Sequence, residues 1–354
     1  MDSAARQHET HMRSEIFEQP TALRATIGAL LPRTAEIAEL AQHARQVLFF
    51  ARGTSDNAAV YGTYLIQTRT GKLASLGSPS VATTYRSRID LSGVMAVGLS
   101  QSGRTEEIIE TLEWARDCGA SVVGITNGAG SPLADLADVA LVTQAGQERA
   151  VPATKTFTCQ LAALAVLSIG LGADLDVGQL KDVPGVIEDL LADASAPGYG
   201  LESVVAELAG VDGLVVSARG LAYSTALELA LKIKEACYLH AMGISWADLQ
   251  HGPIAVVDAK TPAIIMAADA GPTKAAAVAL ARRVTDAGAR AYAIGGGAEL
   301  AAVSSQALAG PALPEWLAPI GLIVPGQLLT EALSRRLGID PDNPRGLSKV
   351  TQTA

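Results

Sequence analysis

Three hydroxyl side chains and one glycine stand within six consecutive residues, in the run Ser100-Gln101-Ser102-Gly103-Arg104-Thr105. The run follows an apolar segment, Val94–Leu99, and precedes a segment with helical periodicity, Glu106–Arg116. Where a strand ends and a helix begins, the first N–H groups of the helix have no partner and the helix dipole favours an anion. Helix capping explains one Ser or Thr there, but it explains three hydroxyls and a glycine poorly. The run therefore predicts a phosphate site formed by its hydroxyls and backbone.

A second hydroxyl-rich run, Gly53-Thr54-Ser55-Asp56-Asn57, stands at another expected junction between a strand and a helix. Taken alone, it is explained equally well as a helix N-cap and as part of a ligand site. The carboxyl ends of adjacent parallel strands meet at one edge of a sheet. We therefore expect this run to lie beside Ser100 and to line the same pocket.

Acid–base chemistry could come from the segment Thr225–His240, which has helical periodicity and carries Glu228, Lys232 and Glu235. Lys232 and Glu235 are three positions apart and share a helix face. They could form an ion pair on a solvated surface, but their neighbours are mostly Leu, Ala and Ile and leave little polar face. A carboxylate in partly apolar surroundings can have a pKa raised toward neutrality, which suits a general base. The residues alone leave both interpretations open.

A histidine and a lysine are weaker candidates. His251 precedes Gly252-Pro253, which makes a rigid turn, and the residues alone favour a hydrogen-bonded turn histidine over a catalytic one. Lys349 follows the stiff run Asn343-Pro344-Arg345-Gly346 near the C-terminus, and the residues alone favour an ordinary tail lysine.

The elements that must position these residues are predicted by apolar runs that alternate with helix-like segments. Runs that are apolar throughout indicate strands buried on both faces of a parallel sheet. A buried helix is expected over Thr154–Gly170 and a closing helix over Pro325–Leu337, with Pro319 and Pro325 breaking the apolar run Leu317–Leu329. The predicted fold class is α/β, with two tandem doubly wound units of parallel sheet flanked by helices. The expected strands are Gln46–Ala51, Val94–Leu99, Ser121–Thr126, Val139–Thr143, Gly213–Ser217, Ala263–Ala267, Arg290–Ile294 and, less clearly, Ala307–Leu313.

A repeat supports the division into two units. Residues 51–53 and 218–220 both read Ala-Arg-Gly, 167 positions apart, and an apolar run precedes each. The same offset carries Ser100-Gln101-Ser102-Gly103 onto Ala267-Ala268-Asp269-Ala270, which has no hydroxyl and no glycine. A duplicated unit that kept one anion site is the simplest interpretation, and it predicts one phosphate per chain, bound by the first half.

The predicted domain limits follow from composition. Residues 171–205 are rich in Gly, Asp, Pro and Ala and predict a boundary with a helix near Val183–Leu191. The predicted segments are a flexible tail over 1–11, a first domain over 12–175, a linker over 176–205, a second domain over 206–338 and a C-terminal tail over 339–354.

Composition limits the partners and the compartment. The net charge of −9 disfavours nucleic acid or an anionic membrane as the main partner. Cys118, Cys159 and Cys237 lack metal-ligand spacing and are expected to be reduced. Residues 1–11 lack the apolar stretch of a signal peptide, and the run Leu161–Leu171 is too short to cross a bilayer. We therefore expect a cytoplasmic protein with no metal site and no membrane partner.

Taken together, the motifs resemble the sugar isomerase (SIS) family, and more closely the isomerase half of the glutamine–fructose-6-phosphate amidotransferases. The resemblance covers nearly the whole chain, and the motifs follow one another at family spacing. Besides the two hydroxyl-rich runs, they are Met12-Arg13-Ser14-Glu15-Ile16-Phe17-Glu18-Gln19-Pro20, Ala153-Thr154-Lys155-Thr156-Phe157, Ala226-Leu227-Glu228, Lys232-Ile233-Lys234-Glu235, His251-Gly252-Pro253 and Pro344-Arg345-Gly346-Leu347-Ser348-Lys349.

The resemblance implies two SIS domains and a C-terminal tail that completes the active site. It implies that Glu235 moves a proton between C1 and C2 of a sugar and that Lys232 assists beside it. His251, supplied by a neighbouring subunit in the family, would help to open the ring, and Lys349 would form an imine with the open-chain ketose. The implied phosphate ligands are Ser55, Ser100, Gln101, Ser102 and Thr105, and the implied sugar contacts are Thr54, Val151 and Ala153.

Two departures from the family pattern affect the expected reaction. The family loop Val-Ala-Ser-Thr-Lys reads Val151-Pro152-Ala153-Thr154-Lys155 here, so a hydroxyl that contacts the sugar is lost at Ala153. The glutaminase half, with its N-terminal cysteine, has no counterpart, and residue 2 is Asp2. We therefore expect a deaminase that resembles the SIS-type glucosamine-6-phosphate deaminases, uses no cofactor, and releases fructose 6-phosphate and ammonia.

Three alternatives remain open from the sequence. The same parts could make a deglycase for a 6-phosphorylated fructosamine, or a glucosamine-6-phosphate synthase that uses external ammonia. A phosphosugar-sensing regulator should keep the phosphate loop but lose the acid–base residues, whereas Glu235, His251 and Lys349 are all present. The expected partners are a small phosphorylated amino sugar and a second copy of the chain in a homodimer with a shared active site.

Overall fold

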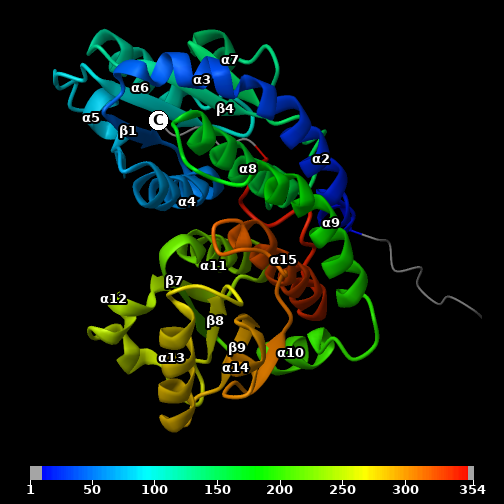
Figure 1. Ribbon diagram of the computed structural model, residues 1–354. Helices are drawn as coiled ribbons and strands as arrows, with labels where there is room; N and C mark the ends of the chain where they lie inside the picture. The colour runs from blue at the N-terminus through cyan, green and yellow to red at the C-terminus, as the bar shows by residue number, and fades with distance from the viewer. Residues whose placement is uncertain (1–9, 350–354) are drawn as a thin grey trace, which may run out of the picture.

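Two five-stranded parallel sheets, each flanked by helices, form the molecule in a computed structural model that describes residues 10–349 (Figure 1). This confirms the predicted α/β fold of two doubly wound units. The first sheet contains β1 (Gln46–Phe50), β2 (Leu73–Leu76), β3 (Val94–Leu99), β4 (Ser121–Thr126) and β5 (Val139–Val142). The second sheet contains β6 (Gly213–Ala218), β7 (His240–Ser245), β8 (Ala263–Ala267), β9 (Ala291–Gly295) and β10 (Gln306–Leu308).

The helices cover both faces of each sheet, which is why the central strands are buried throughout. Those of the first half are α1 (His11–Phe17), α2 (Gln19–Leu30), α3 (Thr34–Leu40), α4 (Gly53–Thr70), α5 (Pro79–Thr83), α6 (Glu106–Asp117), α7 (Pro132–Leu136) and α8 (Lys155–Gly170). Those that follow are α9 (Val177–Ala194), α10 (Leu201–Leu208), α11 (Tyr223–Cys237), α12 (Trp246–Gln250), α13 (Lys274–Asp286), α14 (Gly297–Ala301) and α15 (Ala318–Arg336). Short 3₁₀ turns are η1 (Leu31–Arg33), η2 (Ala41–His43), η3 (Gly220–Ala222) and η4 (Pro253–Val256).

The two sheets share one topology. The first has the order β2-β1-β3-β4-β5, and the second, read from its other edge, has the order β7-β6-β8-β9-β10. The turn after the first strand of each unit is also the same, since Gly53 has a φ of 55° and Gly220 a φ of 63°. A left-handed φ of this kind favours glycine and accounts for the glycine in both Ala-Arg-Gly runs. The shared order and turn agree with the hypothesis of a repeated unit.

The edge strands β2 and β7 were not predicted from the sequence, because neither is a continuous apolar run. Three of the four residues of β2 are exposed, and β7 begins with His240 and contains Gly243. Pairing with β1 and β6 makes them strands in spite of weak local signals. The helix predicted over Thr225–His240 is correspondingly shorter, because Tyr238 adopts a φ of 57° and ends α11.

The prediction that two prolines break the run before the closing helix is wrong. The helix α15 is continuous from Ala318, with Pro319 in its first turn and Pro325 inside it. An internal proline costs about 3 kcal/mol because it removes one backbone hydrogen bond. Burial offsets that cost here, since every residue from Ala318 to Glu331 is buried between the two halves.

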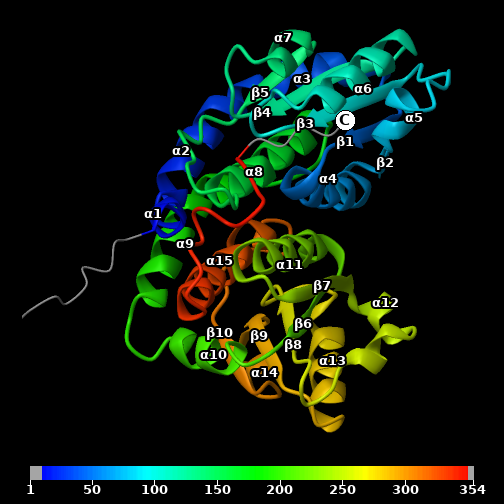
Figure 2. The same ribbon diagram turned by 180° about the vertical axis from the view of Figure 1, so that it is seen from behind.

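The predicted linker and N-terminal tail are more ordered than expected. Within 176–205, the expected helix extends over all of α9, which packs against α2 and α15 and runs from one unit to the other (Figure 2). Thr10 caps α1 through its side chain and His11 is the first helical residue. The rest of the predicted tail, residues 1–9, lies outside the described residues, as do residues 350–354 of the C-terminal tail.

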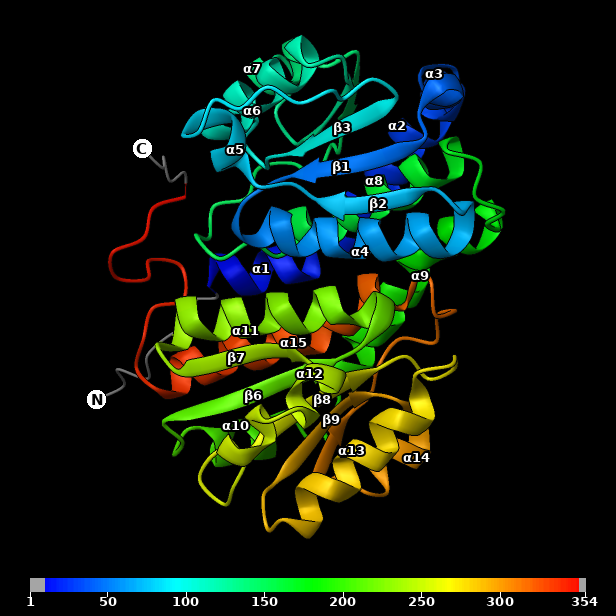
Figure 3. The ribbon, with the colours of Figure 1, turned by 90° about the vertical axis from the view of Figure 1, so that its left-hand side faces the viewer.

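Helices α4 and α11 lie against each other at the junction of the two units, with α8 and α15 beside them (Figure 3). Their apolar faces belong to one core cluster that extends from the first sheet to the second. Because one core joins the halves, side chains from α11 of the second half reach the sheet edge of the first. None of the helices in the described part of the chain combines the length and apolar character that crossing a bilayer requires.

Candidate active site

The run of hydroxyls at 100–105 forms a loop between the carboxyl end of β3 and α6, as predicted. Ser100 Oγ and Thr105 Oγ1 lie 2.9 Å apart, and the N–H of Gly103 donates to Ser100 Oγ over 3.2 Å. Thr105 is the N-cap residue of α6, but its side chain makes no capping hydrogen bond. Its hydroxyl faces Ser100 instead of the helix, so the loop gathers hydroxyls where the unpaired N–H groups of α6 begin.

The second run forms the first turn of α4 at the neighbouring strand end. The side chain of Ser55 is buried, and its Oγ accepts a hydrogen bond of 2.9 Å from Gln160 Nε2 on α8. Because the serine oxygen accepts from the amide, its own O–H remains able to donate to a ligand. Arg52, just before the turn, forms a two-point ion pair with Glu107 of α6, with N–O distances of 2.9 and 2.7 Å.

Helix α11 carries a row of charged side chains toward α4. The carboxylate of Glu228 is fully buried and accepts hydrogen bonds from Thr54 Oγ1 (2.9 Å) and Asn57 Nδ2 (2.8 Å). The ammonium of Lys232 donates to Thr54 Oγ1 (3.1 Å) and to Glu235 Oε2 (2.5 Å). Thr54 therefore joins the row on α11 to the hydroxyl-rich turn of α4.

The environment separates the two carboxylates. Burial raises the pKa of Glu228 above its usual value, although Lys232 and two hydrogen bonds oppose this effect. Burial alone would lower the pKa of Lys232, but the carboxylates of Glu228 and Glu235 outweigh it and raise that pKa. Lys232 is therefore charged. Glu235 is the carboxylate that reaches the pocket, with 22% of its side chain exposed.

The loop between β5 and α8 brings the C-terminal segment to the site. Lys349 Nζ donates to Ala150 O over 2.7 Å and to Glu148 Oε2 over 2.6 Å. Glu148 is fully buried and also accepts hydrogen bonds from the N–H groups of Thr154 (2.9 Å) and Thr156 (3.1 Å). Its pKa would be raised by burial but is held below its usual value by Lys349 and these donors.

These elements enclose a cavity of about 330 Å³, at the small end of the size range of small-ligand pockets. Eleven of the twelve residues predicted for the site line it. They are Thr54, Ser55, Ser100, Gln101, Ser102, Thr105, Val151, Ala153, Lys232, Glu235 and Lys349. The remaining lining residues are Arg52, Gly53, Leu99, Ile108, Leu347 and Ser348.

His251 is the predicted site residue that does not line this cavity. It lies exposed on the turn after α12, and its backbone N–H donates to Asp248 O over 3.0 Å. The pocket of a single chain is thus formed without it. Among residues 10–349, no cluster of three or more His, Cys, Asp or Glu side chains is arranged to hold a metal ion.

Three residues that support the site were not predicted. Glu148 precedes the loop that holds Val151, and Gln160 lies in the apolar helix α8. Asn57 is the last residue of the hydroxyl-rich run that begins at Gly53. Glu148 and Gln160 hydrogen-bond to the pocket residues Lys349 and Ser55, and Asn57 hydrogen-bonds to Glu228, which lies behind the pocket residue Thr54. Such contacts join segments that are far apart in the sequence, so they are seen only in the folded structure. A polar residue within an apolar helix, as at Gln160, is the one local signal that could have indicated a role.

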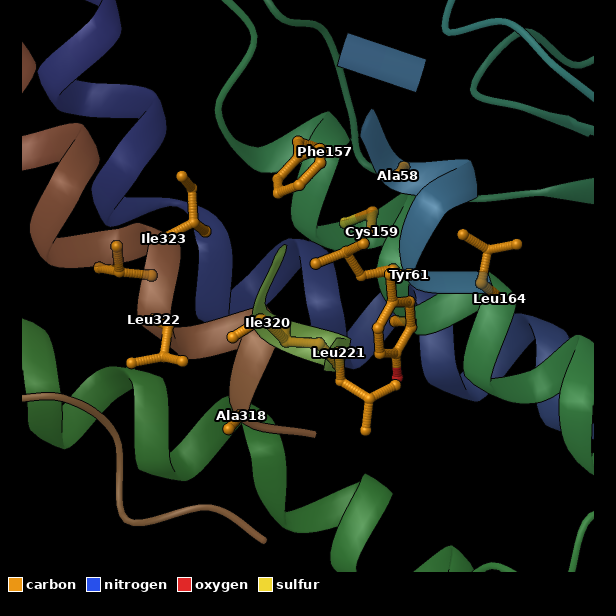
Figure 4. Packing of buried hydrophobic residues seen from close by; sticks show 14 of the residues in the cluster. Ala58, Tyr61, Phe157, Cys159, Leu164, Leu221, Ala318, Ile320, Leu322 and Ile323 are labelled. Atoms are coloured by element: carbon orange, nitrogen blue, oxygen red, sulfur yellow. The ribbon is translucent and has the colours of Figure 1, made fainter. Parts of the chain in front are cut away.

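The equivalent edge of the second sheet is filled with apolar side chains. Leu221 stands at the position of Thr54, and Ala267 and Ala268 stand at those of Ser100 and Gln101; all three are buried. Leu221 packs beside Tyr61 of α4 in the shared core (Figure 4). Asp269, at the position of Ser102, accepts a hydrogen bond of 3.0 Å from the N–H of Gly297. The positions that line the cavity in the first half therefore serve packing in the second.

Comparison with known proteins agrees with this arrangement. A family model described as the SIS domain matches residues 40–170 and 207–320. The isomerizing glutamine–fructose-6-phosphate aminotransferase of Pyrococcus horikoshii is 34% identical over 348 residues, which cover 97% of this chain and 57% of that protein. The corresponding protein of Aquifex aeolicus is 32% identical over 352 residues and is covered to the same 57%. The chain thus spans little more than half the length of these curated relatives.

Solved structures show the same fold over nearly the whole chain. The C-terminal domain of glucosamine-fructose-6-phosphate aminotransferase from Francisella tularensis has a TM-score of 0.84 and 26% identity, and the match covers 97% of this chain and all of that one. A glucosamine-6-phosphate deaminase from Thermotoga maritima has a TM-score of 0.78 over 97% of this chain and all of that one. Its identity of 22% supports a shared fold alone.

Proposed function

Because the chain belongs to the SIS domain family, we propose that its pocket binds a phosphorylated amino sugar and that the protein is an isomerising deaminase. The substrate would be glucosamine 6-phosphate and the products fructose 6-phosphate and ammonia. The observation that carries the proposal is a single cavity in which the hydroxyl loop of β3 and the carboxylate of Glu235 meet. An anion site alone would suit any phosphate ester, whereas a carboxylate within reach of the same ligand suits proton transfer on its carbon chain.

The phosphate is expected to bind at the strand ends of the first sheet. Ser100, Ser102 and Thr105 offer hydroxyl donors, and the helices α4 and α6 point their N-termini toward the same space. The O–H of Ser55 is free to donate, because Gln160 supplies the hydrogen bond that its oxygen accepts. A phosphate held there places the sugar chain toward Lys232, Glu235 and Lys349.

The proposed chemistry consists of proton transfers and one hydrolysis. After ring opening, the substrate has an aldehyde at C1 and an amine at C2. Glu235 removes the proton from C2 and returns it to C1, while a second proton passes from the amine nitrogen to the aldehyde oxygen; the aldehyde becomes a hydroxymethyl group and the amine becomes an imine. Water then adds to the C2 imine and ammonia leaves, which gives the ketone of fructose 6-phosphate. No oxidation or reduction occurs in this sequence.

The neighbouring cations have supporting roles in the proposal. Lys232 donates to Glu235 and keeps its carboxylate oriented toward the cavity. Lys349 places a second amine beside the cavity, where it could stabilise developing charge or form an imine with the ketose. His251 would be supplied by a second copy of the chain in a homodimer and would help to open the ring. We propose that the enzyme acts in the cytoplasm, where its phosphorylated substrates occur.

The deaminating direction is proposed because it needs water and the groups that line the pocket. This chain covers 57% of the length of the aminotransferase relatives, so their names do not fix the direction of its reaction. The glucosamine-6-phosphate deaminase of Thermotoga maritima has the same fold over 97% of this chain, which supports the proposal.

The direct test is to incubate the purified protein with glucosamine 6-phosphate and to measure ammonia and fructose 6-phosphate separately. We expect both products in equal amounts. Turnover of a 6-phosphorylated fructosamine, with none of glucosamine 6-phosphate, would replace the deaminase with a deglycase. A higher kcat/KM for forming glucosamine 6-phosphate from fructose 6-phosphate and ammonium than for releasing ammonia would favour a synthase. Tight binding of these sugars with no turnover would indicate a sensor.

A further inference from the structure

The carboxylate of Glu148 has no role in the reaction proposed above, yet it is among the most completely enclosed charged groups of the chain. Its two oxygens face different parts of the structure. Oε1 accepts hydrogen bonds from the N–H groups of Thr154 and Thr156, which begin α8. Oε2 accepts from Thr156 Oγ1 over 2.7 Å and from Lys349 Nζ over 2.6 Å. One oxygen therefore serves the helix, and the other reaches the C-terminal segment.

The first of these contacts fixes the position of Glu148 itself. Thr154 is the N-cap residue of α8, but its side chain makes no capping hydrogen bond within the helix. Glu148 supplies the acceptor instead, six residues upstream. Because α8 is buried along nearly its whole length in the shared core, the carboxylate is held on a rigid support.

The second contact fixes a segment that has little structure of its own. After α15 ends at Arg336, residues 337–349 form no helix or strand and pass from the second unit to the first (Figure 3). The segment is anchored where Asp342 accepts from the N–H groups of His11 (2.7 Å) and Met12 (2.8 Å). It is anchored again where Tyr238 Oη accepts from the N–H of Arg345 over 2.6 Å. Lys349 lies beyond both anchors.

We propose that Glu148 is a positioning residue, whose buried carboxylate holds the ammonium of Lys349 at the wall of the pocket and fastens the end of the C-terminal segment to the first unit. The attachment of the C-terminal segment to the first unit is argued from the contacts of Glu148 and Lys349. Its effect on turnover rests on the proposed function, in which Lys349 faces the substrate.

A neutral amide cannot replace the carboxylate in this place. Glutamine has the same size, but its NH2 group would meet the N–H groups of Thr154 and Thr156 at one position and Lys349 Nζ at the other, and these can only donate. Glu148→Gln should therefore release Lys349 while leaving the phosphate loop of β3 intact. We expect kcat to fall by up to about 100-fold, with KM changed little, because misplacement of a group beside the reacting atoms acts mainly on turnover.

A double-mutant cycle separates positioning from general damage to the fold. If Glu148 acts through Lys349, then Glu148→Gln should change kcat by less than about twofold once Lys349→Ala is already present. Glu15→Gln is the matched control. Glu15 is also a buried carboxylate, and it accepts hydrogen bonds from Arg149 and Ala150 of the same loop, but it does not touch Lys349. Its effect on kcat should be the same with and without Lys349→Ala.

Hydrogen exchange of the protein without substrate tests the fastening independently of any activity. Glu148→Gln and Lys349→Met should both speed exchange of the backbone N–H groups in 342–349, and Glu15→Gln should not. If Glu148→Gln does not fold, Lys349→Met still tests the attachment, because it removes the same ion pair from the side of the lysine. Unchanged exchange in Lys349→Met, or an equal loss of kcat from Glu148→Gln in both backgrounds, would overturn the proposal. Should the wild-type protein release no ammonia, the proposed function fails, while the exchange result still decides the fastening.

Discussion

At the scale of single residues, the structure separates two carboxylates that the sequence offered together. Glu228 has the apolar surroundings that raise a carboxyl pKa, but it is fully buried and faces Thr54 and Asn57. Glu235, about two turns further along α11, opens into the cavity and pairs with Lys232. An ion pair and a general base were competing interpretations of Lys232 and Glu235. They are compatible, since the pair orients the carboxylate that faces the cavity.

Glu235→Gln tests the assignment of the base. The amide keeps the size of the side chain but cannot accept a proton from C2, so kcat should fall by roughly 10²- to 10⁴-fold, while the substrate still binds. Steady-state kinetics together with calorimetric titration of the substrate would measure both effects. Lys234→Gln is the control, because Lys234 is adjacent on α11 but exposed, and its kinetics should match the wild type. Retained turnover in Glu235→Gln would remove Glu235 from the mechanism.

The lowered pKa of Glu148 predicts a dependence of stability on pH. A carboxyl whose pKa is lower in the folded state contributes stability above its unfolded pKa of about 4.3, and this contribution is lost as the pH falls through the folded value. The free energy of unfolding of the wild-type protein should therefore exceed that of Glu148→Gln. This difference should be largest near neutral pH and should become smaller as the pH falls into the acid range. Urea unfolding of both proteins at a series of pH values would measure it. A difference that grows as the pH falls would contradict the shift.

At the scale of elements, the predictable parts are those whose local signal and tertiary role agree. The strand β3 was predicted with its correct limits because all six of its residues are buried and apolar. The loop that follows it was found because hydroxyls and a glycine are informative at a strand end. The edge strand β2 and the part of α15 that precedes Pro325 were not predicted, since pairing with β1 forms the one and burial between the halves stabilises the other. Lys349 was recognised only by family resemblance, because its partner Glu148 is 201 positions away.

A pair of glycine variants tests the tight packing of the phosphate loop. Gly103 and Gly130 have similar positive φ angles of 65° and 66°, so an alanine at either site costs about 1 kcal/mol in backbone strain. A Cβ at Gly103 would also lie 2.1 Å from Ser131 Oγ, whereas a Cβ at Gly130 meets nothing within 4 Å. Gly103→Ala should raise KM by about tenfold or more, because the loop must move away from the position that binds phosphate. Gly130→Ala should lower the free energy of unfolding by a similar amount, measured by thermal unfolding, and should leave KM unchanged. Equal KM values for the two variants would contradict the role of the loop.

At the scale of the whole molecule, the pocket belongs to neither half alone. The hydroxyl loop comes from the first sheet, Glu235 comes from a helix of the second half, and Lys349 comes from the segment that returns to the first half. The corresponding edge of the second sheet has Leu221 and two alanines in place of the ligand-binding positions. His251 is exposed outside the pocket of its own chain, which is compatible with a role in a second copy.

Mixing two inactive variants tests that role. If His251 completes the pocket of the partner, then His251→Ala and Glu235→Gln should each be inactive alone, while a mixed dimer has one intact pocket. Refolding the two together in equal amounts gives mixed dimers as half of all dimers, so activity should return to about a quarter of the wild-type value. The two variants refolded separately and then assayed together are the control. No recovery, with a dimer shown by light scattering, would place the ring-opening group elsewhere.

Because α4 packs against α11, the distance between the two sheets sets the distance between the hydroxyl loop and Glu235, on which the proposed turnover depends. Each sheet has its own complete set of strands. A small outward tilt of one sheet against the other would therefore leave the pairing within both sheets intact, while it would move the carboxylate of Glu235 away from the proposed phosphate ester. A crosslink that holds α4 against α11 should preserve the rate of turnover. A bulky side chain inserted between these helices should lower that rate without unfolding the protein.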